Sequence, residues 1–79
     1  MPTVLRIDGY RYFFYSNESN EPAHVHVEKG EGEAKIWLEP SIVVAYCIGF
    51  SSREQNSIME LTRENSLFFI QKWYEYFSK

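Results

Sequence analysis

The sequence predicts an α+β fold in which a mainly antiparallel sheet of about five strands, two hairpins plus one strand, precedes a C-terminal helix or helix pair packed on one face. Two short turn sequences, Asp8-Gly9 and the Gly-containing loop 29–32, each separate two β-prone runs, which is typical of β-hairpins. After Gly49 the chain contains neither Gly nor Pro, which favours helix over the remaining residues.

The first hairpin is predicted over residues 4–15, with Asp8-Gly9 at its turn. If the strands pair directly across this turn, Arg6 lies opposite Arg11, and like charges facing each other across strands are unfavourable unless an anion joins them. The two guanidinium groups are therefore expected either to turn to solvent and nearby Glu residues or to form an anion-binding spot.

The central hairpin, formed by residues 22–28 and 33–38, separates two kinds of side chain. Because side chains alternate between the faces of a strand, one face is aliphatic and carries Val25, Val27, Ala34, Ile36 and Leu38. The other face carries His24, His26, Glu28, Glu33, Lys35 and Trp37, which include both histidines of the protein. We expect the aliphatic face to point into the core and the imidazoles to point away from it.

The apolar run 42–48 predicts a fifth strand. It is apolar on both sides, so we expect it in the centre of the sheet or covered on two faces. Cys47, the only cysteine, is expected to be a small buried hydrophobic residue within this strand. Ser51 and Glu54 have the spacing of a capping box and predict the start of the helix.

The second half of the helical part is apolar around more than half of its circumference, over residues 67–77. A sheet covers only one stripe of a helix, so the remaining apolar surface needs another explanation. Either the helix breaks near Asn65 and the last segment folds back, or the surplus surface binds a partner. The second alternative has four candidate interface residues: Phe69, Trp73, Tyr74 and Phe77.

Length and charge exclude several classes of protein. At 79 residues, we expect a single domain over 1–79, with the sheet in 1–48 and the helical part in 51–78.

The net charge of −3 lacks the basic surplus of a generic nucleic-acid binder. No apolar run approaches the roughly 20 residues of a membrane span. With a single cysteine and no signal-peptide layout, we expect a cytoplasmic protein without membrane contact.

The histidine face leaves three interpretations open. His24, His26 and Glu28 project from one strand face and are candidate ligands of a divalent metal, although nothing in the sequence requires one. Alternatively, His24 or His26 transfers a proton while Arg11 and Lys35 hold a phosphate, as in metal-independent RNA cleavage. The third interpretation is an ordinary polar sheet face without chemistry.

Several blocks of the sequence together resemble a known family: GYRYFFYSNE at 9–18, EPAHVHV at 21–27, GEAKIWLEP at 32–40 and WYEYF at 73–77. In this order they are similar to the domain of unknown function 4160 family of small prokaryotic proteins. Ala23 stands where the family pattern has a proline, and Ile36 where it has a Phe. The resemblance implies no assigned activity. It implies that members are often encoded beside another small protein, as in a toxin–antitoxin pair.

Together, these observations predict a component of a two-gene, toxin–antitoxin-like module that acts through contact with a small protein partner or a second copy of itself. RNase-like chemistry at the His24/His26 face, with RNA as a second partner, is the catalytic version of this hypothesis. The alternatives are a metal-binding protein that uses the His-x-His strand and an interaction domain without a catalytic site. The sequence does not decide whether the protein is an enzyme.

Overall fold

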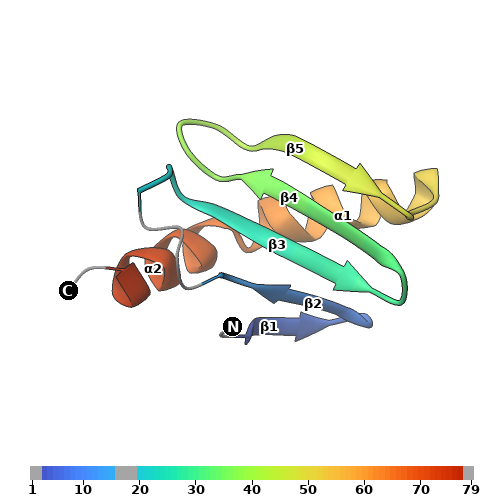
Figure 1. Cartoon of the computed structure of the whole chain (residues 1–79), viewed down its shortest axis with the longest axis horizontal. Helices are drawn as coiled ribbons and strands as arrows, with labels where there is room; N and C mark the ends of the chain where they lie inside the picture. The colour runs from blue at the N-terminus through green and yellow to red at the C-terminus, as the bar shows by residue number, and fades with distance from the viewer. Residues whose placement is uncertain (1–2, 16–19, 78–79) are drawn as a thin grey trace.

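The computed structural model describes residues 3–15 and 20–77 and contains a five-stranded sheet with two helices on one face (Figure 1). The strands lie in the order of the chain, and all four neighbouring pairs are antiparallel. Their bounds are β1 Thr3–Ile7, β2 Tyr10–Phe13, β3 His24–Lys29, β4 Gly32–Trp37 and β5 Val43–Ile48. Helices α1 (Ser52–Glu64) and α2 (Ser66–Phe77) follow. The predicted α+β class is confirmed.

The first hairpin has the predicted register. Ile7 pairs with Tyr10, and Arg6 lies opposite Arg11. The turn residues Asp8 and Gly9 have φ values of 52° and 85°, a region that glycine enters freely and aspartate tolerates better than most residues. Asp8 and Gly9 therefore favour the hairpin because both can adopt the positive φ that a two-residue turn requires.

The central hairpin also has the predicted alternation. Val25 pairs with Ile36 and Val27 pairs with Ala34, and all four side chains are buried in the core beneath the helices. Between these positions, His24 lies opposite Trp37 and His26 opposite Lys35, on the other face of the sheet, although α2 reaches the His24 end of β3 through Trp73. We call this other face the outer face.

The prediction for the fifth strand was wrong in one respect. Residues 43–48 do form a strand, but β5 is an edge strand of the sheet rather than a central one. Val43 and Ile48 are 51% and 57% exposed. The physical reason is connectivity: hairpins added in chain order leave the last strand with one neighbour. Apolar composition alone cannot distinguish a covered strand from an uncovered one.

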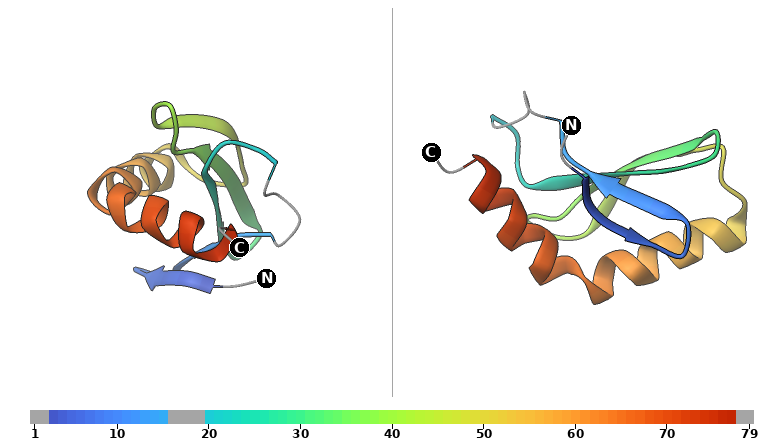
Figure 2. Two further views of the ribbon diagram at one scale, coloured as in Figure 1. Left: turned by 90° about the vertical axis from the view of Figure 1, so that its left-hand side faces the viewer. Right: turned by 90° about the horizontal axis from the view of Figure 1, so that it is seen from below.

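The helical part breaks at Asn65, as one of the two alternatives predicted. Asn65 has φ −111° and ψ 14°, and both its backbone N–H and its side-chain Nδ2 donate to the Leu61 carbonyl, at 3.1 and 2.9 Å. Its own carbonyl accepts from Phe69 N at 2.9 Å. An Asn side chain that competes for backbone acceptors in this way favours helix ends. The second segment does not reverse direction; it continues beneath the sheet at an angle (Figure 2).

The two helices form a single layer end to end, and the core lies between this layer and the sheet (Figure 2). Tyr12 of β2 stacks on Phe69 of α2 with ring centroids 4.7 Å apart. Its hydroxyl lies 3.2 Å from both Ile58 O and Thr62 Oγ1 of α1. Tyr12 thus joins the sheet to both helices. Within the described part of the chain, neither helix has the length and apolar character needed to cross a membrane.

Candidate functional site

Both histidines belong to a cluster of rings on the outer face of the sheet and at the end of β3 that α2 approaches. We call it the ring cluster. Its members are Phe13, Tyr15, His24, His26, Trp37 and Trp73. The centroids of the two imidazoles lie 5.1 Å apart, so the His-x-His spacing does place the two side chains together.

His24 is completely buried in the ring cluster, with 0% of its surface exposed. Its ring centroid lies 4.7 Å from Trp73 of α2 and 5.2 Å from Trp37 of β4. Its Nδ1 lies 2.9 Å from the Pro22 carbonyl, which fixes the ring orientation. A general base must reach the proton it removes. The sealed position of His24 is therefore typical of a packing residue that joins α2 to the sheet.

His26 is 4% exposed and stacks on Phe13, with ring centroids 5.5 Å apart and planes at 25°. The Tyr15 ring meets it edge-on at 4.6 Å. On the neighbouring strand β4, Lys35 lies directly opposite His26. Sequence analysis did not assign Phe13 or Tyr15 to the site, although both fall on the outer face by strand alternation from the buried Tyr12.

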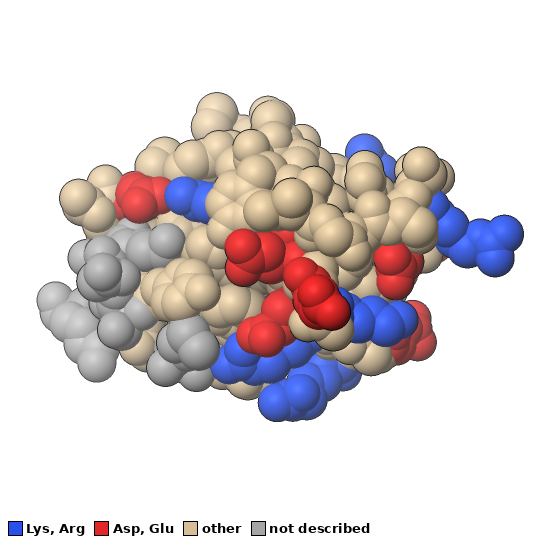
Figure 3. Space-filling model, turned by 45° about the vertical axis from the view of Figure 1, so that its right-hand side comes forward, with Lys and Arg blue, Asp and Glu red and all other residues tan. Residues whose placement is uncertain are grey.

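The two predicted phosphate-binding cations lie beside the ring cluster, and each is paired with a carboxylate. Arg11 donates to Glu28, which lies opposite it on β3, and its guanidinium sits 4.4 Å from the centre of the Phe13 ring. Lys35 Nζ lies 2.8 Å from Glu21 Oε1 and 4.4 Å from the centre of the Trp37 ring. Acidic and basic side chains lie interleaved on this side of the molecule (Figure 3). The four predicted catalytic residues thus come together, but their cations are neutralised.

The predicted metal ligands His24, His26 and Glu28 share the outer face, but the Glu28 carboxylate accepts from Arg11. Over residues 3–15 and 20–77, no three His, Cys, Asp or Glu side chains form a group that could hold a metal ion. The metal site stays a prediction, without a third ligand in the described part of the chain.

The four predicted partner-binding residues of α2 divide into two groups. Phe69 and Trp73 are buried in the core at 0% and 3% exposure. Tyr74 is exposed and its hydroxyl donates to Glu39 of the β4–β5 loop, which raises the pKa of the phenol. Phe77 is partly buried against Phe14 and Trp73. Phe69 and Trp73 are therefore core, while Leu67, Phe68 and Tyr74 leave an exposed apolar surface on α2.

Another exposed apolar surface lies beside β5, where sequence analysis did not place a site. A groove of about 220 Å³ runs between β5 and α1, and we call it the β5 groove. Val44 and Cys47 line it from the strand, and Gln55, Asn56, Ile58 and Met59 line it from the helix. Burial raises the pKa of the Cys47 thiol, so this cysteine lacks the thiolate character of a reactive one. The sequence does contain a hint of this arrangement: when successive hairpins add strands in the order of the chain, the last strand lies at the edge of the sheet.

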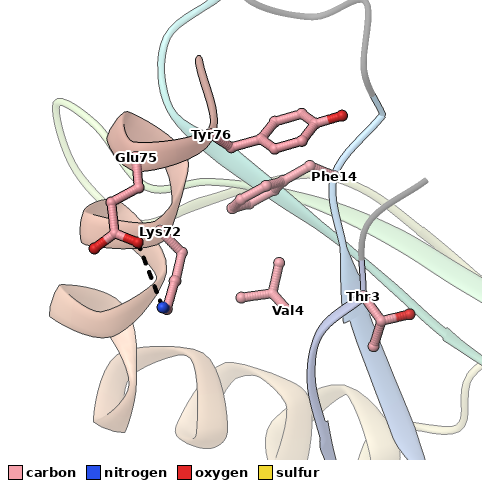
Figure 4. Close-up of a pocket in the computed structure, with 6 residues that line it drawn as sticks. All are labelled: Thr3, Val4, Phe14, Lys72, Glu75 and Tyr76. Carbon is pink, nitrogen blue, oxygen red and sulfur yellow. Dashed lines mark hydrogen bonds and ion pairs between the residues drawn. The ribbon is translucent and has the colours of Figure 1, made fainter. Parts of the chain in front are cut away.

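A second hollow, of about 400 Å³, opens between β1 and α2 (Figure 4). The Phe14 and Tyr76 rings line it, and the Lys72–Glu75 ion pair, with an N–O distance of 3.4 Å, lies on its α2 side. Lys72 and Glu75 thus satisfy each other, and none of the predicted site residues lines this hollow.

A family model described as Domain of unknown function (DUF4160) matches residues 9–74. The chain belongs to this family. The resemblance stated from the sequence blocks is thereby confirmed, and no curated protein and no solved structure matches the chain. In this DUF4160 protein the matched range contains strands β2 to β5, α1 and all members of the ring cluster, so both candidate surfaces lie within the family region.

Proposed function

We propose that this DUF4160 protein is the protein-binding component of a two-gene, toxin–antitoxin-like module and that it binds a helix of its partner in the β5 groove. The gene context implied by the family resemblance supports the choice of partner. The uncovered apolar face of β5 is the single observation that carries the choice of surface.

Dimensions support a helix as the ligand. Five strands spaced about 4.8 Å apart make a sheet about 19 Å wide, whereas one helix with its side chains is about 10–12 Å across. Because α1 and α2 lie end to end, they provide a layer only one helix wide (Figure 2). The space left beside α1 is the β5 groove, where Ala34 and Ile36 of β4 lie next to Val44 and Cys47 of β5.

The lining of the groove fits the apolar face of an amphipathic helix. Val44, Ile58 and Met59 supply the apolar floor, and the exposed amides of Gln55 and Asn56 supply a polar rim. The volume of about 220 Å³ is below the roughly 300–1,000 Å³ of small-molecule sites. A few side chains inserted from a partner helix match this size better than a metabolite, as in helix-in-groove recognition.

The test is binding between the purified full chain and the purified product of the adjacent gene, measured by calorimetry. Asn56→Arg places a long cation at the groove rim and should weaken binding by about tenfold or more. Gln71→Arg is the matched control, because Gln71 is also exposed but lies on α2 outside the groove. Met59→Glu serves as a second groove variant.

Equal affinities for wild type, Asn56→Arg and Met59→Glu would contradict the proposed surface. Absence of any binding to the adjacent gene product would contradict the proposed function. Folding of each variant is checked by thermal unfolding, since a partly buried Met at position 59 contributes to the core as well.

RNA cleavage at the His24/His26 face is a second candidate function, because His26 lies on β3 between the strands that carry Arg11 and Lys35. It requires that His26, which is 4% exposed, be uncovered before it can reach a substrate proton. Its test is cleavage of single-stranded RNA in the presence of a chelator. His26→Phe keeps a ring for stacking on Phe13 and removes both nitrogens, so activity should disappear while the fold remains. Undiminished cleavage by this variant, or none by wild type, would exclude the site.

A further inference from the structure

The outer edge of β5 carries a second inference, separate from the β5 groove. Among the described residues, β5 pairs with β4 and has no strand neighbour on its other side. Natural edge strands usually carry charges, proline or a bulge that hinders further pairing. The opposite edge has a charge, since the exposed Arg6 lies within β1, whereas β5 has only the bulge at Ala45. The sequence between Glu39 and Arg53 contains no charged residue at all.

We infer that β5 pairs antiparallel with β5 of a second copy of this chain, which joins two five-stranded sheets into one of ten strands. This inference goes beyond the proposed function, because it uses the strand edge and leaves the groove face open.

The side-chain pattern of β5 is self-complementary. A bulge at Ala45 interrupts the pairing with β4, since Lys35 pairs with Tyr46 and Ile36 with Val44. As a result, Val44 and Cys47 both face the helices, while Val43, Tyr46 and Ile48 face outward. Because of the bulge, only some pairings between two copies of β5 place side chains of the same sheet face opposite each other.

One register uses all six residues of the strand. It places Val43 opposite Ile48 of the second copy and Val44 opposite Cys47 of the second copy, with the two-fold axis between Ala45 and Tyr46. Val43 and Ile48, which both face outward, then meet, and so do Val44 and Cys47, which both face the helices, while the bulged Ala45 lies opposite Tyr46 of the second copy. A shift by one residue would pair opposite faces.

Charge does not oppose this arrangement, because β5 itself contains no charged residue. Val43 and Ile48, both more than half exposed in the single chain, lose water on pairing. An isologous contact of this kind closes as a dimer and does not extend into a fibre.

The experiment is the molar mass of the purified full chain by light scattering and sedimentation. Wild type should have twice the chain mass. Val43→Glu alone, or Ile48→Lys alone, places a charge against an apolar side chain of the second copy and should weaken the dimer about tenfold or more. The double variant places each introduced charge opposite its counterpart in the second copy and should recover at least part of the lost affinity.

Leu67→Lys is the matched control, because Leu67 is an 81% exposed apolar residue on α2. The Leu67→Lys protein should stay dimeric. The groove variant Asn56→Arg should also stay dimeric while it loses partner binding, so the two failures can be told apart. A monomeric wild type would overturn the inference. So would a double variant as weak as the single ones, or a monomeric Leu67→Lys.

Discussion

Replacing His24 by Ala tests whether the ring cluster is core or catalytic apparatus. The imidazole is 0% exposed and lies within 5.2 Å, centroid to centroid, of His26, Trp37 and Trp73. Truncating buried aromatic residues costs about 3–5 kcal/mol. Because an imidazole is smaller than a phenyl ring, we expect the free energy of unfolding to fall by about 3 kcal/mol. A domain of this size is typically stable by only about 4–12 kcal/mol.

The effect should be visible in the melting temperature and in tryptophan fluorescence. In small domains 1 kcal/mol corresponds to about 4–8 °C, so His24→Ala should lower Tm by about 12–24 °C. Trp37 and Trp73 are the only tryptophans, and both contact His24, so fluorescence during urea unfolding reports directly on this region.

His24→Phe is the control that separates packing from hydrogen bonding. It keeps a ring and loses the Nδ1 contact to the Pro22 carbonyl, which can bond water instead because Pro22 is exposed. We expect a loss of about 1 kcal/mol. A His24→Ala protein as stable as wild type would refute the assignment of this ring to the core. Equal losses for Ala and Phe would show that packing is not the main contribution.

Three further substitutions test the fold. Tyr12→Phe should lower unfolding free energy in urea by about 1 kcal/mol, because the Thr62 hydroxyl keeps a backbone acceptor; a loss above about 3 kcal/mol would contradict this. Gly49→Ala introduces a Cβ at φ +77°, 2.9 Å from the backbone of β4, and should cost about 1–3 kcal/mol in thermal unfolding; an unchanged Tm would contradict this strain. The Ser51 backbone N–H donates to Glu54 and holds the pKa of this carboxyl below its usual range. The contact therefore stabilises the fold at pH values above the unfolded-state pKa, and this stabilisation is lost as the pH falls through the folded-state pKa. The stability difference between wild type and Glu54→Gln should therefore shrink on acidification, and a pH-independent difference would contradict the assignment.

The histidine face illustrates how far sequence reasoning reaches. Alternation placed His24 and His26 on one face, and hairpin pairing placed Lys35 opposite His26, because both depend on neighbours in the same hairpin. Burial of His24 depends on Trp73, which lies on α2 and is remote in sequence. Local patterns therefore predict which side chains share a surface, but not whether another element seals it.

The predicted partner residues of α2 depend on tertiary packing as well. The apolar circumference of 67–77 left a break near Asn65 and an interface as alternatives. Phe69 and Trp73 are core, since α2 packs aromatic side chains against β2 and the ring cluster, whereas Tyr74 stays exposed. The apolar run of β5 suggested a covered strand, yet it is an exposed edge. The hydrophobic content of a segment indicates how much apolar surface has to be buried. The order of the strands decides which part of that surface has no neighbouring element to bury it.

By itself, the sequence determined the hairpin turns, the strand alternation, the helix cap at Ser51 and the break at Asn65, whose side-chain amide donates to a backbone carbonyl. Each of these arises from backbone conformation or hydrogen bonding within a few residues. Only the tertiary structure decided that Arg11 is neutralised by Glu28, that His24 is sealed and that the β5 face is left open. These outcomes depend on the directions in which separate elements pack, and one helical layer is too narrow to cover five strands.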